Sequence, residues 1–227
     1  MSVVDRLSSV VQVALLAGLI GCAAAGGAAD APPDPAAAAA LAVATSPEYR
    51  LEVLFDWNMV DRDARIGGRG LLRLDRAARA RVDLFGPRGE TLAAAIMDGT
   101  AMRVVPQAAS AMLPPPALLW AALGVFREPE DAPLTATRVD GDQTRLEYSR
   151  DRTRWTFQFA GSALRSTEWT DGSGRRTVTL TGDAGFDVPR DAAFRDWTEF
   201  RELNLSVTAI EERTSFDADT WILPGER

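Results

Sequence analysis

From Tyr49 onward the chain alternates apolar and polar residues with a period of two, and this pattern restricts the possible folds more than any other feature. The alternating runs are short and are separated by turn residues such as Asp98-Gly99 and Asp140-Gly141. Successive side chains of a strand point to opposite faces, so these runs predict an antiparallel sheet joined by hairpins. We expect strands at 49–60, 70–75, 80–85, 91–97, 102–106, 134–139, 144–149, 153–160, 164–169, 177–181 and 203–210.

One segment interrupts the predicted strands. Pro114, Pro115 and Pro116 precede the run 117–126, in which apolar residues recur at helical spacing. A single helix inside an antiparallel meander predicts a mainly β protein, in which a curved antiparallel sheet forms an incomplete barrel and a short helix plugs its concave face. A helix packed on a flat sheet as plain core fits the same pattern.

The alternation also assigns the two faces of the sheet. One face is polar and includes Arg73, Arg81, Asp83, Arg145 and Glu147. The apolar face and the helix together supply the candidate lining of a cavity, which consists of Leu84, Leu92, Ile96, Met102, Trp120, Leu123, Phe126, Tyr148, Trp155, Phe157 and Phe159. A stripe of this kind forms either an ordinary packed core or the wall of an apolar pocket.

The first 22 residues have the pattern of a bacterial lipoprotein signal peptide. Arg6 precedes an apolar run at 10–20, and Leu19-Ile20-Gly21 leads directly to Cys22, the only cysteine. The run is shorter than the roughly 20 residues that span a bilayer. We therefore expect residues 1–21 to be removed and Cys22 to become an acylated N-terminus that anchors the protein to a membrane. The alternative is an ordinary secretory peptide with a chance thiol.

The chain after Cys22 divides into two parts. Residues 22–47 are rich in Ala and Pro and predict a tether, within which Asp34 and Pro35 are suited to begin a short helix. A tether without a helix fits the composition as well. Residues 48–227 are expected to form one domain.

The composition excludes several kinds of chemistry. All 25 residues counted as Lys or Arg are Arg, and the chain has no His. A Ser-His-Asp triad, a Schiff-base lysine and a histidine metal site are therefore absent. The net charge of −7 argues against nucleic-acid binding through a basic surface.

Two further sets of residues have ordinary structural explanations. Acidic pairs such as Asp61 with Asp63 and Glu211 with Glu212 lie at turns or strand ends, so we interpret them as solvated. Gly67, Gly68 and Gly70 lie inside a strand pattern, so we interpret them as a β-bulge and not as a phosphate loop. We expect a protein that is not an enzyme and that binds no cofactor or metal.

The order of these features resembles the LolA/LolB family of periplasmic lipoprotein carriers, and among them LolB, the outer-membrane lipoprotein receptor. The resemblance covers about residues 49–181 and rests on the signal peptide, the tether, the strand meander and the following motifs: the turn Gly86-Pro87-Arg88-Gly89, the helix Leu118-Leu119-Trp120-Ala121-Ala122-Leu123-Gly124, the strand Arg145-Leu146-Glu147-Tyr148, the aromatic strand Trp155-Thr156-Phe157-Gln158-Phe159 and the stretch from Trp169 to Leu180.

The resemblance implies an open barrel around an apolar cavity that shelters acyl chains of lipoproteins and passes them to the outer membrane. The apolar residues named above would then be lipid-binding, and the partners would be acylated lipoproteins or lipids and a LolA-type carrier. Ala23 after Cys22 implies an anchor in the outer membrane, facing the periplasm. We expect a monomer. The alternative function is that of a structural or sensory envelope lipoprotein, whose half-barrel binds a protein or peptidoglycan partner.

Two features depart from LolB. The chain continues well beyond Thr181, to Arg227, whereas LolB ends soon after the matching strand. Pro87 and Arg88 occupy the loop in which LolB presents a leucine for membrane contact. Because a guanidinium enters hydrocarbon only at a high energetic cost, we expect Arg88 to contact lipid headgroups without insertion.

Overall fold

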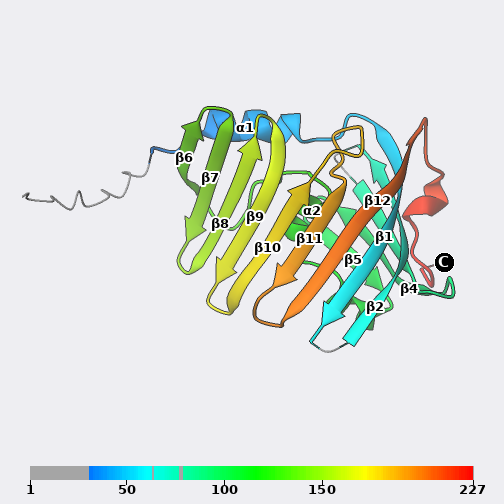
Figure 1. Ribbon diagram of the computed structural model, residues 1–227. Helices are drawn as coiled ribbons and strands as arrows, with labels where there is room; N and C mark the ends of the chain where they lie inside the picture. The colour runs from blue at the N-terminus through cyan, green and yellow to red at the C-terminus, as the bar shows by residue number, and fades with distance from the viewer. Residues whose placement is uncertain (1–30, 63, 77–78, 227) are drawn as a thin grey trace, which may run out of the picture.

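The computed structural model describes residues 31–62, 64–76 and 79–226, so the predicted signal peptide and Cys22 lie outside the described residues. A curved sheet of twelve strands makes up most of this part of the chain (Figure 1). The helices and strands in chain order are α1 (Pro35–Ala44), β1 (Arg50–Asp61), β2 (Ala64–Asp75), β3 (Arg79–Phe85), β4 (Thr91–Asp98), β5 (Ala101–Val105), the 3-10 helix η1 (Gln107–Met112), α2 (Pro116–Ala122), β6 (Leu134–Asp140), β7 (Gln143–Arg150), β8 (Thr153–Ala160), β9 (Ala163–Asp171), β10 (Gly174–Thr181), β11 (Asp191–Asp196), β12 (Arg201–Arg213) and the 3-10 helix η2 (Ala218–Trp221).

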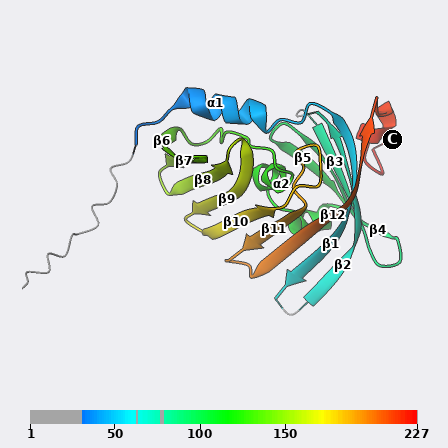
Figure 2. The same ribbon diagram turned by 45° about the horizontal axis from the view of Figure 1, so that its top comes forward.

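The sheet is antiparallel and open. Its strand order is β5-β4-β3-β2-β1-β12-β11-β10-β9-β8-β7-β6, so β5 and β6 follow each other in the chain but form the two opposite edges. The segment that joins them, 106–133, contains α2, which contacts β9, β10 and β11. The sheet curves around α2 (Figure 2). The prediction of a mainly β, incomplete barrel with a short helix on its concave face is confirmed.

The end of the predicted tether forms the helix α1, so of the two alternatives, a tether with a short helix and a tether without one, the structure has the first. Asp34 caps it, since its side-chain Oδ1 accepts a hydrogen bond from the Ala37 amide at 3.0 Å. Both ends of α1 are attached to the sheet domain. The Asp34 amide donates to Thr137 Oγ1 of β6, and the Phe126 amide, after α2, donates to Thr45 Oγ1.

Helix α2 is shorter than the predicted 117–126. It ends at Ala122, because Gly124 adopts a left-handed conformation with φ of 82° that terminates the helix. Phe126 therefore lies beyond the helix, although it remains buried.

Strand β11 lies in a segment for which no strand was predicted. The β-bulge proposed for Gly67, Gly68 and Gly70 of β2 was wrong. The pairing of β1 with β2 is continuous from Arg50 opposite Asp75 to Asp61 opposite Ala64. Gly70 lies opposite Phe55, and a Cβ atom at position 70 would come within 2.1 Å of the Phe55 ring. The glycine is therefore needed so that the aromatic ring can lie across the neighbouring strand.

The face assigned to Ile96 was also wrong. At the start of β4 a bulge places Leu92 between the residues that pair with Leu84 and Phe85 of β3, which shifts the alternation by one residue. Ala93, Ala95 and Met97 consequently belong to the main core, whereas Ile96 packs with Ala94 and Leu223 in a separate cluster on the opposite face.

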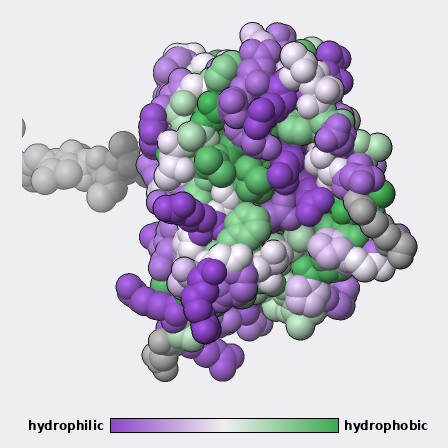
Figure 3. All heavy atoms as spheres, turned by 90° about the vertical axis from the view of Figure 1, so that its right-hand side faces the viewer, coloured by the Kyte–Doolittle hydropathy of each residue, from purple (hydrophilic) through white to green (hydrophobic). Residues whose placement is uncertain are grey.

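The C-terminal segment 214–226 forms that second cluster by covering the predicted polar face. Arg81 of β3 donates hydrogen bonds to the carbonyls of Thr220 and Ile222 and forms an ion pair with Asp83 at 2.9 Å. Asp83 is only 4% exposed as a result. The side of the molecule on which this segment lies has a mainly hydrophilic surface with separate apolar patches (Figure 3).

Candidate ligand-binding site

An apolar pocket lies between α2 and the concave face of the sheet. We call it the interior pocket; it has a volume of about 30 Å³ and is lined by Val53, Phe55, Leu72, Val82, Leu119, Ala122, Leu123, Val188, Pro189, Arg190, Ala192, Leu205 and Val207. A water molecule needs roughly 10–15 Å³ of such space, so this conformation has room for a few waters but not for an acyl chain. Of the predicted lipid-binding residues, Leu123 lines this pocket.

The predicted aromatic residues lie together at one end of the core. Phe126 contacts the edges of Phe157 and Phe159, with ring centroids 4.7 Å and 5.4 Å apart, and Tyr148 lies 6.3 Å away. Leu84 is buried in the main core, and Leu92 and Met102 pack against that core, whereas Ile96 belongs to the second cluster. In this structure the aromatic end is a packed core.

A column of stacked groups extends from this core across the strands. Trp155 stacks on Phe157 at 6.0 Å and on Trp169 of β9 at 5.2 Å, with nearly parallel rings. The guanidinium of Arg176 on β10 lies over the Trp169 ring, 4.6 Å from its centroid. Trp169 and Arg176 were not among the predicted site residues, because the contacts of Trp155 with Trp169 and of Trp169 with Arg176 depend on the pairing of three strands.

A second and larger cavity borders this column. We call it the indole cavity; its volume is about 280 Å³, and it is lined by Thr100, Pro115, Pro116, Ala117, Trp120, Arg127, Glu128, Pro129, Glu130, Asp131, Trp155 and Trp169. Trp120 and Trp155 were predicted, whereas Arg127 and the carboxylates around it were not. The interior pocket and the indole cavity both use residues of α2.

Four buried donor atoms without a protein acceptor belong to side chains that line the indole cavity. They are Arg127 Nε and Nη2, Trp155 Nε1 and Trp169 Nε1. Burial lowers the pKa of Arg127. A buried donor that lacks an acceptor costs about 1–3 kcal/mol, so these groups favour a ligand or water that accepts hydrogen bonds.

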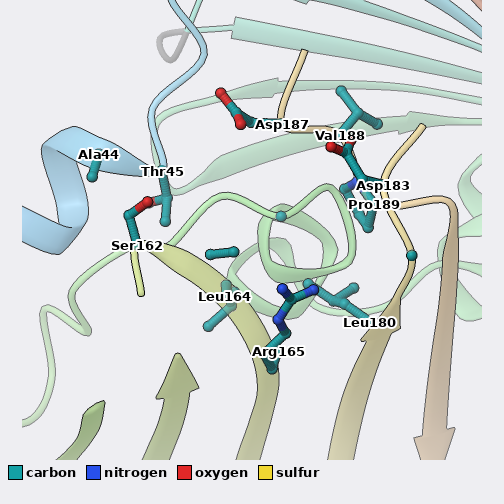
Figure 4. A pocket seen from close by; sticks show the side chains of 13 residues that line it. Ala44, Thr45, Ser162, Leu164, Arg165, Leu180, Asp183, Asp187, Val188 and Pro189 are labelled. Atoms are coloured by element: carbon teal, nitrogen blue, oxygen red, sulfur yellow. The ribbon is translucent and has the colours of Figure 1, made fainter. Parts of the chain in front are cut away.

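A third pocket lies where α1 ends beside the sheet (Figure 4). This rim pocket has a volume of about 140 Å³ and is lined by Ala44, Thr45, Gly124, Ser162, Ala163, Leu164, Arg165, Leu180, Gly182, Asp183, Asp187, Val188 and Pro189. Arg165 comes from β9, and Asp187 and Val188 come from the loop between β10 and β11. Val188 and Pro189 line both the rim pocket and the interior pocket, so this loop separates the two spaces.

A buried ion pair supports the turn between β11 and β12. Asp196 is 7% exposed and accepts hydrogen bonds from Arg176 Nε at 2.7 Å and from the amides of Thr198 and Glu199. Burial by itself raises the pKa of Asp196, but the hydrogen bonds from Glu199, Arg176 and Thr198 outweigh it, and the pKa lies below its ordinary value. The charged form is therefore the one that stabilises the fold.

This ion pair predicts a dependence of stability on pH. A carboxylate whose folded pKa is depressed stabilises the fold above its unfolded pKa of about 3.9 and loses that effect as the pH falls through the folded pKa. We expect wild type to lose more stability between pH 5 and pH 3 than Asp196→Asn, as measured by urea denaturation. Parallel curves for the two proteins would contradict a role for this carboxylate.

Residues 31–62, 64–76 and 79–226 contain no group of three Asp, Glu, Cys or His side chains placed to hold a metal ion. Neither α1 nor α2 is long and apolar enough to cross a membrane.

Comparison with known proteins gives similarity at the level of structure. No family model matches the sequence, and no curated protein matches it. The fold is similar to that of the LolA superfamily protein NE2245 from Nitrosomonas europaea, with a TM-score of 0.57, 14% identity, and coverage of 84% of this chain and 98% of that one. A putative outer membrane lipoprotein-sorting protein domain from Vibrio parahaemolyticus has a TM-score of 0.49 at 9% identity, covering 81% of this chain and 94% of that one. The likeness to the Nitrosomonas protein shows that this chain has the fold of a LolA superfamily protein.

Proposed function

We propose that this protein is a non-enzymatic carrier or receptor that binds acyl chains of lipoproteins or envelope lipids and acts in lipoprotein localisation to the outer membrane. The observation that supports the proposal most is the interior pocket, whose lining is almost wholly apolar and which lies between α2 and the concave face of a LolA-like sheet. Each methylene that enters such a pocket contributes about 0.8 kcal/mol. LolB is the member of the family that we propose as the functional counterpart.

Binding requires the interior pocket to open. We propose the loop between β10 and β11 as the segment that moves. Its hydrogen bonds from Ala184 N to Val188 O and from Val188 N to Gly185 O are internal to the loop, and the Val207 amide of β12 holds its end at the Arg190 carbonyl. Displacement of Val188 and Pro189 would join the rim pocket to the interior pocket. An acyl chain could then extend from the interior pocket into the rim pocket.

The test is saturable binding of a fluorescent fatty-acid probe by the full chain carrying Cys22→Ala, which removes the predicted acylation site. We expect an acylated lipoprotein to displace the probe and the same lipoprotein without acyl chains to leave it bound. Absence of probe binding would contradict the proposed function and would favour the alternative of a structural or sensory lipoprotein.

Cys22 is proposed to anchor the protein in the outer membrane, on the periplasmic face. Metabolic labelling with palmitate is expected to mark wild type and to leave Cys22→Ala unlabelled, because the thiol is the predicted acceptor of the acyl chains. Equal labelling of both proteins would rule out this anchor. Membrane fractionation of the labelled protein tests the outer-membrane location.

Arg88 is proposed to contact lipid headgroups. It is exposed in the turn between β3 and β4, which the hydrogen bonds from Gly86 N to Glu90 O and from Gly89 N to Gly86 O hold together. A basic residue at an anionic surface contributes about 1 kcal/mol, so Arg88→Glu should slow delivery of a lipoprotein to liposomes about fivefold or more. Arg88→Leu should accelerate delivery, because leucine can enter the bilayer. Equal rates for the three proteins would refute a role for Arg88.

A further inference from the structure

We infer that the indole cavity binds the zwitterionic head of a phospholipid of the phosphoethanolamine type. Its phosphate would accept hydrogen bonds from Arg127 and from the N–H groups of Trp155 and Trp169, and its ammonium group would face the carboxylates at the cavity rim. The inference rests on the proposed function, since it assigns a head to the amphiphile whose chain that function requires.

The aromatic rings around the cavity present their edges to a ligand. Trp155 stacks with both Phe157 and Trp169, and the guanidinium of Arg176 lies over the Trp169 ring. The guanidinium of Arg127 lies over the Trp120 ring at 4.6 Å. The ring faces in these contacts are therefore unavailable both for stacking on a sugar and for an aromatic cage around a quaternary ammonium.

The edges offer hydrogen-bond donors. Trp155 is only 5% exposed, and its Nε1 has no protein acceptor, as is also true of Trp169 Nε1 and of Arg127 Nε and Nη2. By contrast, Trp120 already donates its Nε1 to the carbonyl of Gly99 at 2.7 Å. The three remaining side chains come from different elements and line one cavity, so an anionic group rich in acceptor oxygens is the complementary ligand.

The charges at the cavity rim select among anionic heads. One guanidinium, that of Arg127, is accompanied in the lining by three carboxylates, those of Glu128, Glu130 and Asp131, which are all exposed. A head with only negative charge would be repelled by the carboxylates. A phosphate followed by an ammonium group matches the half-buried guanidinium and the acidic residues of the indole cavity at the same time.

The experiment compares three single-chain lipids that carry the same acyl chain and differ only in their heads. Lysophosphatidylethanolamine, lysophosphatidylglycerol and monoacylglycerol are titrated against the full chain carrying Cys22→Ala. We expect the phosphoethanolamine lipid to bind about tenfold more tightly than the other two. Its phosphate makes charge-assisted hydrogen bonds that monoacylglycerol lacks, and its ammonium group offsets the repulsion by the carboxylates that the phosphoglycerol head meets. Equal affinities would overturn the inference and leave the proposed function intact, whereas no binding of any of the three would overturn both.

Variants then locate the site. Arg127→Gln should reduce binding of the phosphoethanolamine lipid about tenfold, and Trp155→Phe, which keeps a ring but lacks the N–H group, should reduce it by a smaller factor. Binding of monoacylglycerol should be unchanged in both, which also shows that the variants are folded. Arg145→Gln is the matched control, since Arg145 pairs with Glu147 on the polar face of the sheet. The same loss in the control would overturn the assignment.

The role of the three carboxylates that line the indole cavity is tested by removal of their negative charge. The triple variant Glu128→Gln, Glu130→Gln, Asp131→Asn should abolish the preference for phosphoethanolamine over phosphoglycerol by improving the binding of the phosphoglycerol lipid. A preference that persists in the triple variant would show that the rim does not recognise the ammonium group and would overturn that part of the inference.

Discussion

Replacement of Phe126 by alanine is expected to lower the free energy of unfolding by about 3–5 kcal/mol, the range found for buried aromatic residues. Phe126 is 1% exposed, and its ring contacts the edges of Phe157 and Phe159 and lies near Tyr148. Truncation leaves a space that these rings, fixed on neighbouring strands, fill only in part. Urea denaturation monitored by tryptophan fluorescence measures the change.

The same substitution distinguishes a packed core from an open cavity at the aromatic end. A loss below about 1 kcal/mol would show that the ring contributes little packing, as expected for the wall of an open cavity. Val139→Ala is the control, because Val139 is 67% exposed on β6. It should change the free energy of unfolding by no more than about 0.5 kcal/mol.

Leu123→Glu is expected to reduce the affinity for the fluorescent fatty-acid probe at least a hundredfold. Leu123 is 8% exposed, follows α2 directly and lines the interior pocket together with Leu119 and Val188. A carboxylate there either remains charged next to the acyl chain or takes up a proton, and both are unfavourable in an apolar site. Probe titration is combined with circular dichroism, which checks that the variant is folded.

A conservative variant separates this effect from a general loss of structure. Leu123→Met keeps the volume and apolar character of the side chain, so it should bind the probe within a few-fold of wild type. A folded Leu123→Glu protein that binds the probe normally would place the acyl chain outside the interior pocket. Wild type that fails to bind, together with a Leu123→Glu protein that unfolds, would identify the region as plain core.

The alternation from Tyr49 onward was sufficient to predict the class of fold. Ten of the strands lie close to their predicted ranges because a half-buried strand needs an apolar residue at every second position. The helix between β5 and β6 was also predictable, since Pro116 begins it and apolar residues at helical spacing follow. Strand β11 was missed because its segment 191–196 has a short and weak alternation.

The residues that line the cavities were less predictable from the sequence than the strands. Leu123, Trp120 and Trp155 were predicted from apolarity alone and do line the interior pocket or the indole cavity. Arg127 and Glu128 were missed, because charged residues after a helix are usually solvated and the sequence contains no sign of their burial. Ile96 was placed on the wrong face, since a single bulged residue reverses the alternation that follows it.

The sequence by itself determined the antiparallel sheet, the inserted helix and the apolar composition of the concave face, because each depends on the local periodicity of side chains. Only the tertiary structure decided which side chains meet. Trp155 pairs with Trp169 because an irregularity between Gln158 and Phe159 shifts the register of β8 and β9 by one residue. A regular hairpin would have placed Glu168 opposite Trp155. Register depends on how neighbouring strands pack, so the indole cavity and its unpaired donors appear only once the strands are assembled.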